Sequence, residues 1–205
     1  DEIKRTTPNK PTPFVKLLDP QSFARFQEHL YEFPSFSYIT RTVRRYPYQS
    51  GAAVFGYLSE VTENNIAQSS GFYELGDYIG TTGIEQFYDS LLRGEKGYNY
   101  QVVDVKNTYK GKYKEGKEDV VPVAGWDMVS GLDAELQAYG EKLMQGKVGG
   151  ILAIDPSTGE ILAYVSSPSY DPNLLTGRYR RHNFNVLFKD FYKPLLNRPI
   201  QAMYP

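Results

Sequence analysis

The chain has 205 residues, and its 23 Lys and Arg against 24 Asp and Glu give a formal net charge of −1 at pH 7. This balance argues against nucleic acid as a partner, because nucleic-acid sites need an excess of basic residues. The chain has no cysteine and two histidines, which excludes disulfides, thiol catalysis and metal sites built from thiolates or several histidines. No metal ion and no cofactor are expected.

The first elements are a helix and a strand. A helix is expected after Asp19, which can cap it, and Pro20 suits the first helical turn. Residues 36–46 then alternate between apolar and polar side chains, which predicts a strand with Arg45 on the same face as Val43.

A short strand near residues 56–63, a glycine-rich loop and a second helix are expected next. Residues 82–85 read Thr-Gly-Ile-Glu and fit a capping box, in which the Thr and Glu side chains each bond to the other residue's backbone N–H. Gly80 and Gly83 resemble part of a phosphate loop, but no Lys-Ser or Lys-Thr follows them. A tight turn is therefore the preferred explanation of these glycines.

The middle of the chain predicts a strand over residues 98–106 and a charged hairpin or loop over residues 109–118. A boundary is expected near residues 122–126. This divides the chain into a first domain, residues 1–127, and the start of a second domain, residues 128–205.

The second half holds the strongest local signals. Asp133 can cap a helix whose expected buried face consists of Leu132, Leu136, Tyr139 and Leu143. Residues 148–165 predict a β-hairpin that turns at residues 155–159, Asp-Pro-Ser-Thr-Gly. Both strands are apolar on both faces, as in the middle of a covered sheet. By itself the hairpin is therefore expected to be exposed, disordered or paired with a second copy.

Four segments in order resemble the pedestal, or dimerisation, domain of class B penicillin-binding proteins. They are residues 44–48 (RRYPY), 56–61 (GYLSEV), 76–85 (GDYIGTTGIE) and 92–97 (LRGEKG). Leu-Asp at 132–133, with Gln137 and Glu141 at helical spacing, resembles the linker into the transpeptidase domain of that family. Residues 154–168 and the Tyr-Asp-Pro-Asn of 170–173 resemble the first hairpin of that domain and its exit. The pattern is most similar to the members that act in cell elongation.

The resemblance implies an α+β fold: an elongated pedestal of short strands and helices, followed by the first helix and β-hairpin of a transpeptidase-like domain. It also implies a parent enzyme that cross-links peptidoglycan through a serine nucleophile. The catalytic motifs of the family, Ser-x-x-Lys, Ser-x-Asn and Lys-Ser/Thr-Gly, do not occur in this sequence. The nucleophile is expected just beyond Pro205, so no residue here is assigned a catalytic role and this chain is expected to be inactive.

Six residues are expected to have structural or interdomain roles. Arg45 and Glu85 are predicted to form a partly buried charge pair, and the alternative is two exposed charges with Glu85 as a capping residue. The other four are Gly80, Gly83, Asp133 and Gln137.

The resemblance also implies partners and a location. Peptidoglycan stem peptides and β-lactams would bind the catalytic domain, whereas a polytopic glycosyltransferase and elongation scaffold proteins would bind the pedestal. The membrane would be reached only through an N-terminal anchor helix outside this chain, on the periplasmic side of the bacterial inner membrane. Two alternatives remain open: a non-enzymatic periplasmic scaffold or wall-binding module, and a sensor or β-lactamase-like protein with the same fold.

Overall fold

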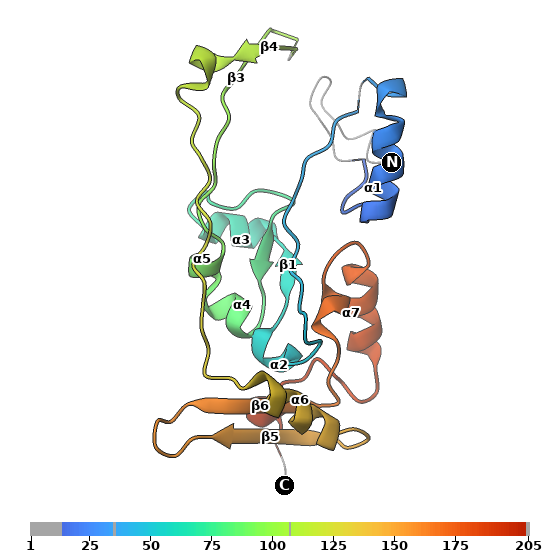
Figure 1. The fold of residues 1–205 in the computed structure, drawn as a ribbon, viewed down its shortest axis with the longest axis vertical. Helices are drawn as coiled ribbons and strands as arrows, with labels where there is room; N and C mark the ends of the chain where they lie inside the picture. Colours follow the sequence, from blue (N-terminus) through green and yellow to red (C-terminus); the bar gives the residue numbers. More distant parts are fainter. Residues whose placement is uncertain (1–13, 35, 107, 204–205) are drawn as a thin grey trace. The chain divides into compact units, whose positions relative to one another are not determined.

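The computed structural model describes residues 14–34, 36–106 and 108–203 (Figure 1). Two compact units are each formed from separate stretches of the chain. The first unit combines the described residues up to Arg41 with Arg93–Trp126, and the second combines Thr42–Leu92 with the described residues from Asp127 onward. The mixture of helices and small antiparallel sheets confirms the predicted α+β class. These units are groups of contacting segments and do not define domain boundaries along the sequence. The predicted domain division after residue 127 therefore stays a prediction.

The first unit contains the first predicted helix. Its elements are α1 (Pro20–Glu28), η2 (Leu30–Glu32), β3 (Gln101–Val103), β4 (Tyr109–Lys112) and η3 (Tyr113–Gly116), where η denotes a 3₁₀ helix. The Asp19 side chain accepts a hydrogen bond from the Ser22 N–H at 2.9 Å, and Pro20 begins the helix. The predicted cap and first turn of α1 are therefore confirmed.

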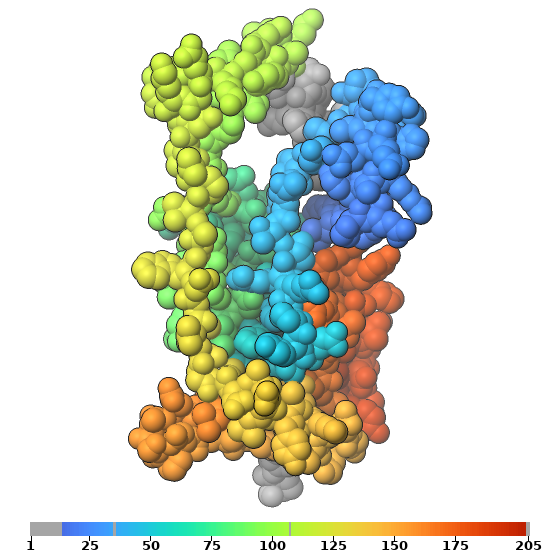
Figure 2. Space-filling view, viewed as in Figure 1, coloured from blue at the N-terminus to red at the C-terminus, as the bar shows by residue number. Residues whose placement is uncertain are grey.

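An arm, defined as residues 95–123, makes up the second part of this unit. Its strands β3 and β4 are antiparallel, and isolated bridges join Glu95 to Val123 and Tyr98 to Val120. The strand predicted over residues 98–106 thus forms over three residues only, and the segment predicted as a hairpin or loop, residues 109–118, holds its partner strand β4 followed by η3. All three residues of β3 are exposed, and Figure 2 shows the β3–β4 end of the arm in yellow-green.

The strand predicted over residues 36–46 does not form: the described residues of this segment have no ladder partner. Ile39, expected on an apolar face, is 83% exposed. Alternation shows which side chains share a face, but a strand also needs a neighbour for its N–H and C=O groups. Tyr38 contacts the ring of Phe23 instead, edge to face, with 5.1 Å between ring centroids.

The second unit begins with a small helix-and-strand group. Its elements are α2 (Ala52–Phe55), β1 (Leu58–Glu60), α3 (Glu63–Gln68), β2 (Tyr78–Gly80), α4 (Gly83–Phe87) and α5 (Asp89–Leu92). β1 and β2 are antiparallel, with Leu58 opposite Gly80. The predicted helix after Thr82 is two short helices, separated at Tyr88. α3 was not predicted from the sequence, because its capping box pairs Thr62 with an asparagine in place of the usual Glu or Gln.

The unit continues with the predicted capped helix and hairpin. The elements are α6 (Ala134–Leu143), β5 (Gly149–Ile154), β6 (Ile161–Ser167), η4 (Pro172–Leu175), α7 (Arg180–Lys189) and α8 (Arg198–Gln201). β5 and β6 pair in antiparallel register, from Gly149 opposite Ser167 to Ile154 opposite Ile161, which confirms the hairpin. Among the described residues, none of the helices has the length and apolar character needed to cross a membrane.

The buried face predicted for α6 is wrong. Gln137 and Gly140 are buried, whereas three residues expected in the core are exposed: Leu136, Tyr139 and Leu143. A Cβ at Gly140 would lie 2.8 Å from a methyl group of Val165. Because Gly140 has no side chain, α6 can approach β6 closely on the face that carries Gln137 and Gly140. This face, rather than the apolar stripe, is therefore the buried one.

The hairpin is covered unequally. Ala163 and Val165 of β6 are buried within the single chain, whereas Leu152 and Ile154 of β5 are half exposed. The expectation of an exposed or self-paired hairpin is therefore wrong for most of β6, whereas Ile161 at its start and alternate residues of β5 are exposed.

Candidate functional site

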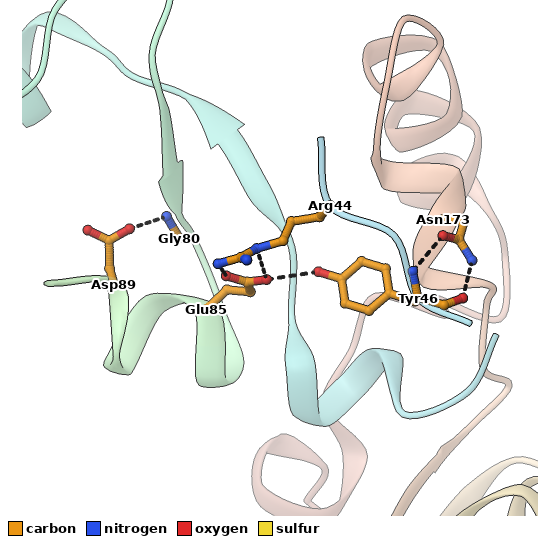
Figure 3. Close-up of polar contacts among 6 residues, drawn as sticks. All are labelled: Arg44, Tyr46, Gly80, Glu85, Asp89 and Asn173. Carbon is orange, nitrogen blue, oxygen red and sulfur yellow. Dashed lines mark hydrogen bonds and ion pairs between the residues drawn. The ribbon is translucent and has the colours of Figure 1, made fainter. Parts of the chain in front are cut away.

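Glu85 is a buried carboxylate in the first turn of α4, with 6% of its surface exposed. Arg44 contacts both of its oxygens, from Nε to Oε1 at 2.9 Å and from Nη2 to Oε2 at 3.2 Å (Figure 3). The Tyr46 hydroxyl donates to Oε1 at 3.1 Å. A bidentate guanidinium and a hydroxyl together offset the cost of removing a carboxylate from water. Arg44, Tyr46, Glu85 and Asn173, described below, form what we call the polar junction.

The ion pair of Glu85 forms one position away from the predicted one. Arg44 is the partner, and Arg45 is exposed. In an extended chain successive side chains point to opposite sides. Such alternation lets Arg44 and Tyr46, two residues apart, reach Glu85 together, and Arg45 between them is exposed.

The predicted capping box at the start of α4 is also wrong. Thr82 is the N-cap residue, but its side chain makes no capping hydrogen bond. The Glu85 carboxylate is turned to Arg44 and Tyr46 instead. Two strong long-range contacts thus replace a local one.

Asn173 in η4 bonds to the main chain of Tyr46 as a neighbouring strand would (Figure 3). Its Oδ1 accepts from the Tyr46 N–H at 2.9 Å, and its Nδ2 donates to the Tyr46 carbonyl at 2.8 Å. Oδ1 of Asp171 accepts from Nδ2 and from the N–H of Asn173, each at 2.8 Å, which orients the amide. Burial, and then the nearby charge of Glu85, raises the pKa of Tyr46, so its phenol remains a donor. This role of Asn173 was not predicted, because the Asp-Pro-Asn of residues 171–173 indicates only a local turn.

Gly80 and Gly83 lie where α4 approaches its neighbours most closely. A Cβ at Gly80 would lie 1.8 Å from the carbonyl oxygen of Glu85, and a Cβ at Gly83 would lie 2.3 Å from that of Val54. The Gly80 N–H donates to Oδ1 of Asp89 at 3.0 Å (Figure 3). Gly83 has φ +61°, as a tight turn requires, whereas Gly80 is needed only for close approach.

Asp133 and Gln137 attach α6 to β6. The Asp133 carboxylate accepts from the N–H groups of Glu135 and Leu136, both at 2.9 Å, and so caps the helix. Gln137, 4% exposed, accepts from the Tyr164 N–H at 2.7 Å and donates to the Tyr164 carbonyl at 3.0 Å. The Gln137 amide therefore hydrogen-bonds both main-chain groups of Tyr164, on the edge of β6 that does not pair with β5.

Replacing Gln137 with leucine is expected to lower the free energy of unfolding by about 2 kcal/mol, because both main-chain groups of Tyr164 lose a buried partner. Guanidinium denaturation followed by circular dichroism measures this. Gln145→Leu, at an exposed position after α6, is the matched control and is expected to change stability by less than about 0.5 kcal/mol. Equal effects of the two substitutions would contradict the assigned role.

These contacts hold segments of the chain together. The Arg44 guanidinium binds the Glu85 carboxylate, and the Asn173 amide binds the main chain of Tyr46. Within the part of the chain that the structure describes, no three His, Asp or Glu residues are grouped so that they could hold a metal ion. The contacts of the polar junction support positioning of the segments that they join.

Two family models match consecutive regions of the chain. Residues 2–129 match the penicillin-binding protein dimerisation domain, and residues 149–205 match the penicillin-binding protein transpeptidase domain. Tyr46 lies in the first region and Asn173 in the second, so the polar junction joins the two.

Curated relatives and solved structures are also similar to this chain over most of its length. The peptidoglycan D,D-transpeptidase MrdA of Escherichia coli K12 is 36% identical over 188 residues, which are 89% of this chain and 29% of that protein. The complex between PBP2 and MreC from Helicobacter pylori has a TM-score of 0.70 at 29% identity, covering 90% of this chain and 34% of that chain. A structure on the coordination of polymerization and crosslinking by a peptidoglycan synthase complex has a TM-score of 0.63 at 28% identity, covering 92% of this chain and 36% of that chain.

This chain therefore spans about a third of the length of the proteins that it matches. The dimerisation model alone matches more than half of the chain. The chain belongs to the penicillin-binding protein family, within which it is similar to PBP2.

Proposed function

We propose that this chain is the pedestal and the first part of the catalytic domain of a peptidoglycan D,D-transpeptidase that cross-links stem peptides during cell elongation. The observation that carries the proposal is the pair of hydrogen bonds between Asn173 and the main chain of Tyr46, at 2.9 and 2.8 Å. They join the pedestal region directly to the transpeptidase region. The similarity to a D,D-transpeptidase over most of the chain supports the activity.

In this proposal a serine beyond Pro205 is the nucleophile. Its hydroxyl attacks the carbonyl of the penultimate D-Ala of a stem peptide, the bond to the last D-Ala breaks, and that D-Ala leaves. The acyl group then passes to an amine of another strand, which frees the serine. A β-lactam acylates the same serine. In this proposal the role of this chain is to position the domain that carries that serine.

The arm is the surface that we assign to protein partners. It exposes six valines: Val102, Val103, Val105, Val120, Val121 and Val123. Exposed apolar residues gathered in one region are typical of protein interaction sites. The similar Helicobacter pylori structure contains MreC, and another similar structure is a synthase complex that combines polymerization with crosslinking. An elongation scaffold protein and a polytopic glycosyltransferase are therefore the proposed partners.

The proposed location is the periplasmic side of the bacterial inner membrane, where stem peptides are cross-linked. Attachment to the membrane would come from an N-terminal helix outside this chain. The similarity to PBP2 supports this placement.

Penicillin labelling tests the activity. We expect the natural protein that contains this chain to form one covalent penicillin adduct, and peptide mapping to place it on a serine shortly after Pro205. Excess unlabelled penicillin should abolish the label, and heat-denatured protein should take up none. A folded natural protein that forms no adduct would contradict the proposal and favour a non-enzymatic scaffold or wall-binding module.

A further inference from the structure

The start of α8 is attached to β6 by side chains. The Tyr164 hydroxyl donates to Oδ1 of Asn197, the residue before α8, at 2.6 Å. The Ser166 hydroxyl donates to the Leu196 carbonyl at 2.8 Å and accepts from the Arg198 N–H at 3.2 Å. Tyr164 and Ser166 share a face of β6, because side chains alternate along a strand. Two neighbouring residues on one face of β6 therefore bind three consecutive residues at the start of α8.

The position of α8 depends on contacts of this kind. The helix has four residues, and so short a helix is not stable by itself. The guanidinium of Arg198, a residue only 7% exposed, donates to the carbonyls of Lys193 and Tyr192. Gly150 leaves room for Pro199, since a Cβ there would lie 2.8 Å from the proline ring. These contacts do not involve the Tyr164 hydroxyl, so we expect the fold to survive the loss of that hydroxyl.

Tyr164 and Asn197 also connect α8 to other parts of the second unit. The Tyr164 main chain is bound to α6, as described above. Oε1 of Glu141, on α6, accepts a hydrogen bond at 2.7 Å from the N–H of Gly51, which is the residue before α2. Nδ2 of Asn197 donates to the Ala53 carbonyl in α2 at 3.5 Å. The start of α8 is thus placed relative to α2, in the pedestal region, by two routes.

We propose that Tyr164 and Asn197 are positioning residues for acylation. Their hydrogen bond sets the direction in which α8 leads into Ala202 and Met203. This inference rests on the proposed function, in which the nucleophilic serine follows shortly after. A reacting atom displaced by about 1 Å can slow a reaction by up to roughly a hundredfold. A hydroxyl remote from the substrate therefore affects the chemical step without touching the substrate.

The test measures penicillin acylation of the natural protein. For Tyr164→Phe and for Asn197→Leu, we expect the first-order acylation step to slow by roughly tenfold or more, with the dissociation constant of the non-covalent penicillin complex unchanged. Tyr179→Phe removes the hydroxyl of an exposed tyrosine and is the matched control, expected to react at the wild-type rate.

A double variant distinguishes loss of the Tyr164–Asn197 hydrogen bond from independent destabilisation by each substitution. If the hydrogen bond is the cause, Tyr164→Phe combined with Asn197→Leu should be no slower than the slower single variant. Amide exchange at residues 200–203 should also become faster in each single variant. Since Asn197 is only half-buried, Asn197→Leu provides a second route if Tyr164→Phe fails to fold.

The failures are distinguishable. A wild type that is acylated, with Tyr164→Phe and Asn197→Leu acylated equally fast, would overturn this inference and leave the proposed function intact. Additive losses in the double variant, or unchanged exchange at residues 200–203, would overturn it as well. A folded wild type that forms no adduct would overturn the proposed function, and the inference with it.

Discussion

Replacing Arg44 with leucine is expected to lower the free energy of unfolding by about 3 kcal/mol, because the buried Glu85 carboxylate loses its positive partner. The side chain of Glu85 is 8% exposed, so water cannot take the place of the guanidinium. The side chain of Arg44 is 39% exposed, which places the effect at the lower end of the range for buried pairs. Guanidinium denaturation followed by circular dichroism measures the change.

Arg45→Leu is the matched control, because Arg45 is the adjacent arginine and is exposed. It is expected to change stability by less than about 0.5 kcal/mol. The double variant Arg44→Leu/Glu85→Leu should be more stable than Arg44→Leu alone, since it no longer buries an unpaired carboxylate. A greater loss from Arg45→Leu than from Arg44→Leu would show that the assigned partner of Glu85 is wrong.

Replacing Gly80 with alanine is expected to cost about 3 kcal/mol, the upper part of the usual range for overpacking. The added methyl would lie 1.8 Å from the carbonyl oxygen of Glu85 and 2.2 Å from its carbonyl carbon. Both are main-chain atoms, so no side-chain rotation relieves the clash and α4 must move away from β2. The same denaturation experiment measures the loss.

Gly71→Ala separates this clash from backbone strain. Gly71 has φ +85° and no atom near its Cβ position, so the substitution should cost only about 1 kcal/mol of left-handed strain. Gly80 has no positive φ, and its cost arises from contact alone. If Gly80→Ala were no more destabilising than Gly71→Ala, the close approach of α4 to β2 would be incorrect.

The polar junction and the α8 contacts govern different properties. Changes at Arg44 or Gly80 alter contacts that hold α4 in place, and we expect them to appear in stability. Loss of the Tyr164 hydroxyl removes one of several contacts at α8, and we expect it to appear in the acylation step. A substitution that moved both properties together would indicate that α4 and α8 respond as one body.

The sequence by itself determined the elements whose signals lie within a few residues. Asp19 followed by Pro20 predicted the start of α1, and Asp133 predicted the cap of α6. The turn at residues 155–159 predicted the hairpin of β5 and β6. Such signals act through local hydrogen bonds and fixed dihedral angles, so they need no knowledge of distant segments. The ordered motifs likewise indicated the family, which the family models confirm.

Only the tertiary structure decided which residues meet. Asn173 binds a residue 127 positions away, and Asn197 binds one 33 positions away. No local pattern encodes such distances. Arg44 rather than Arg45 pairs with Glu85 because the placement of α4 selects one side of an extended segment. Gln137 and Gly140 are buried because β6 lies close enough to favour a small residue and an amide over leucine. Residues 36–46 form no strand because alternation cannot supply the neighbouring strand that their main-chain groups would need.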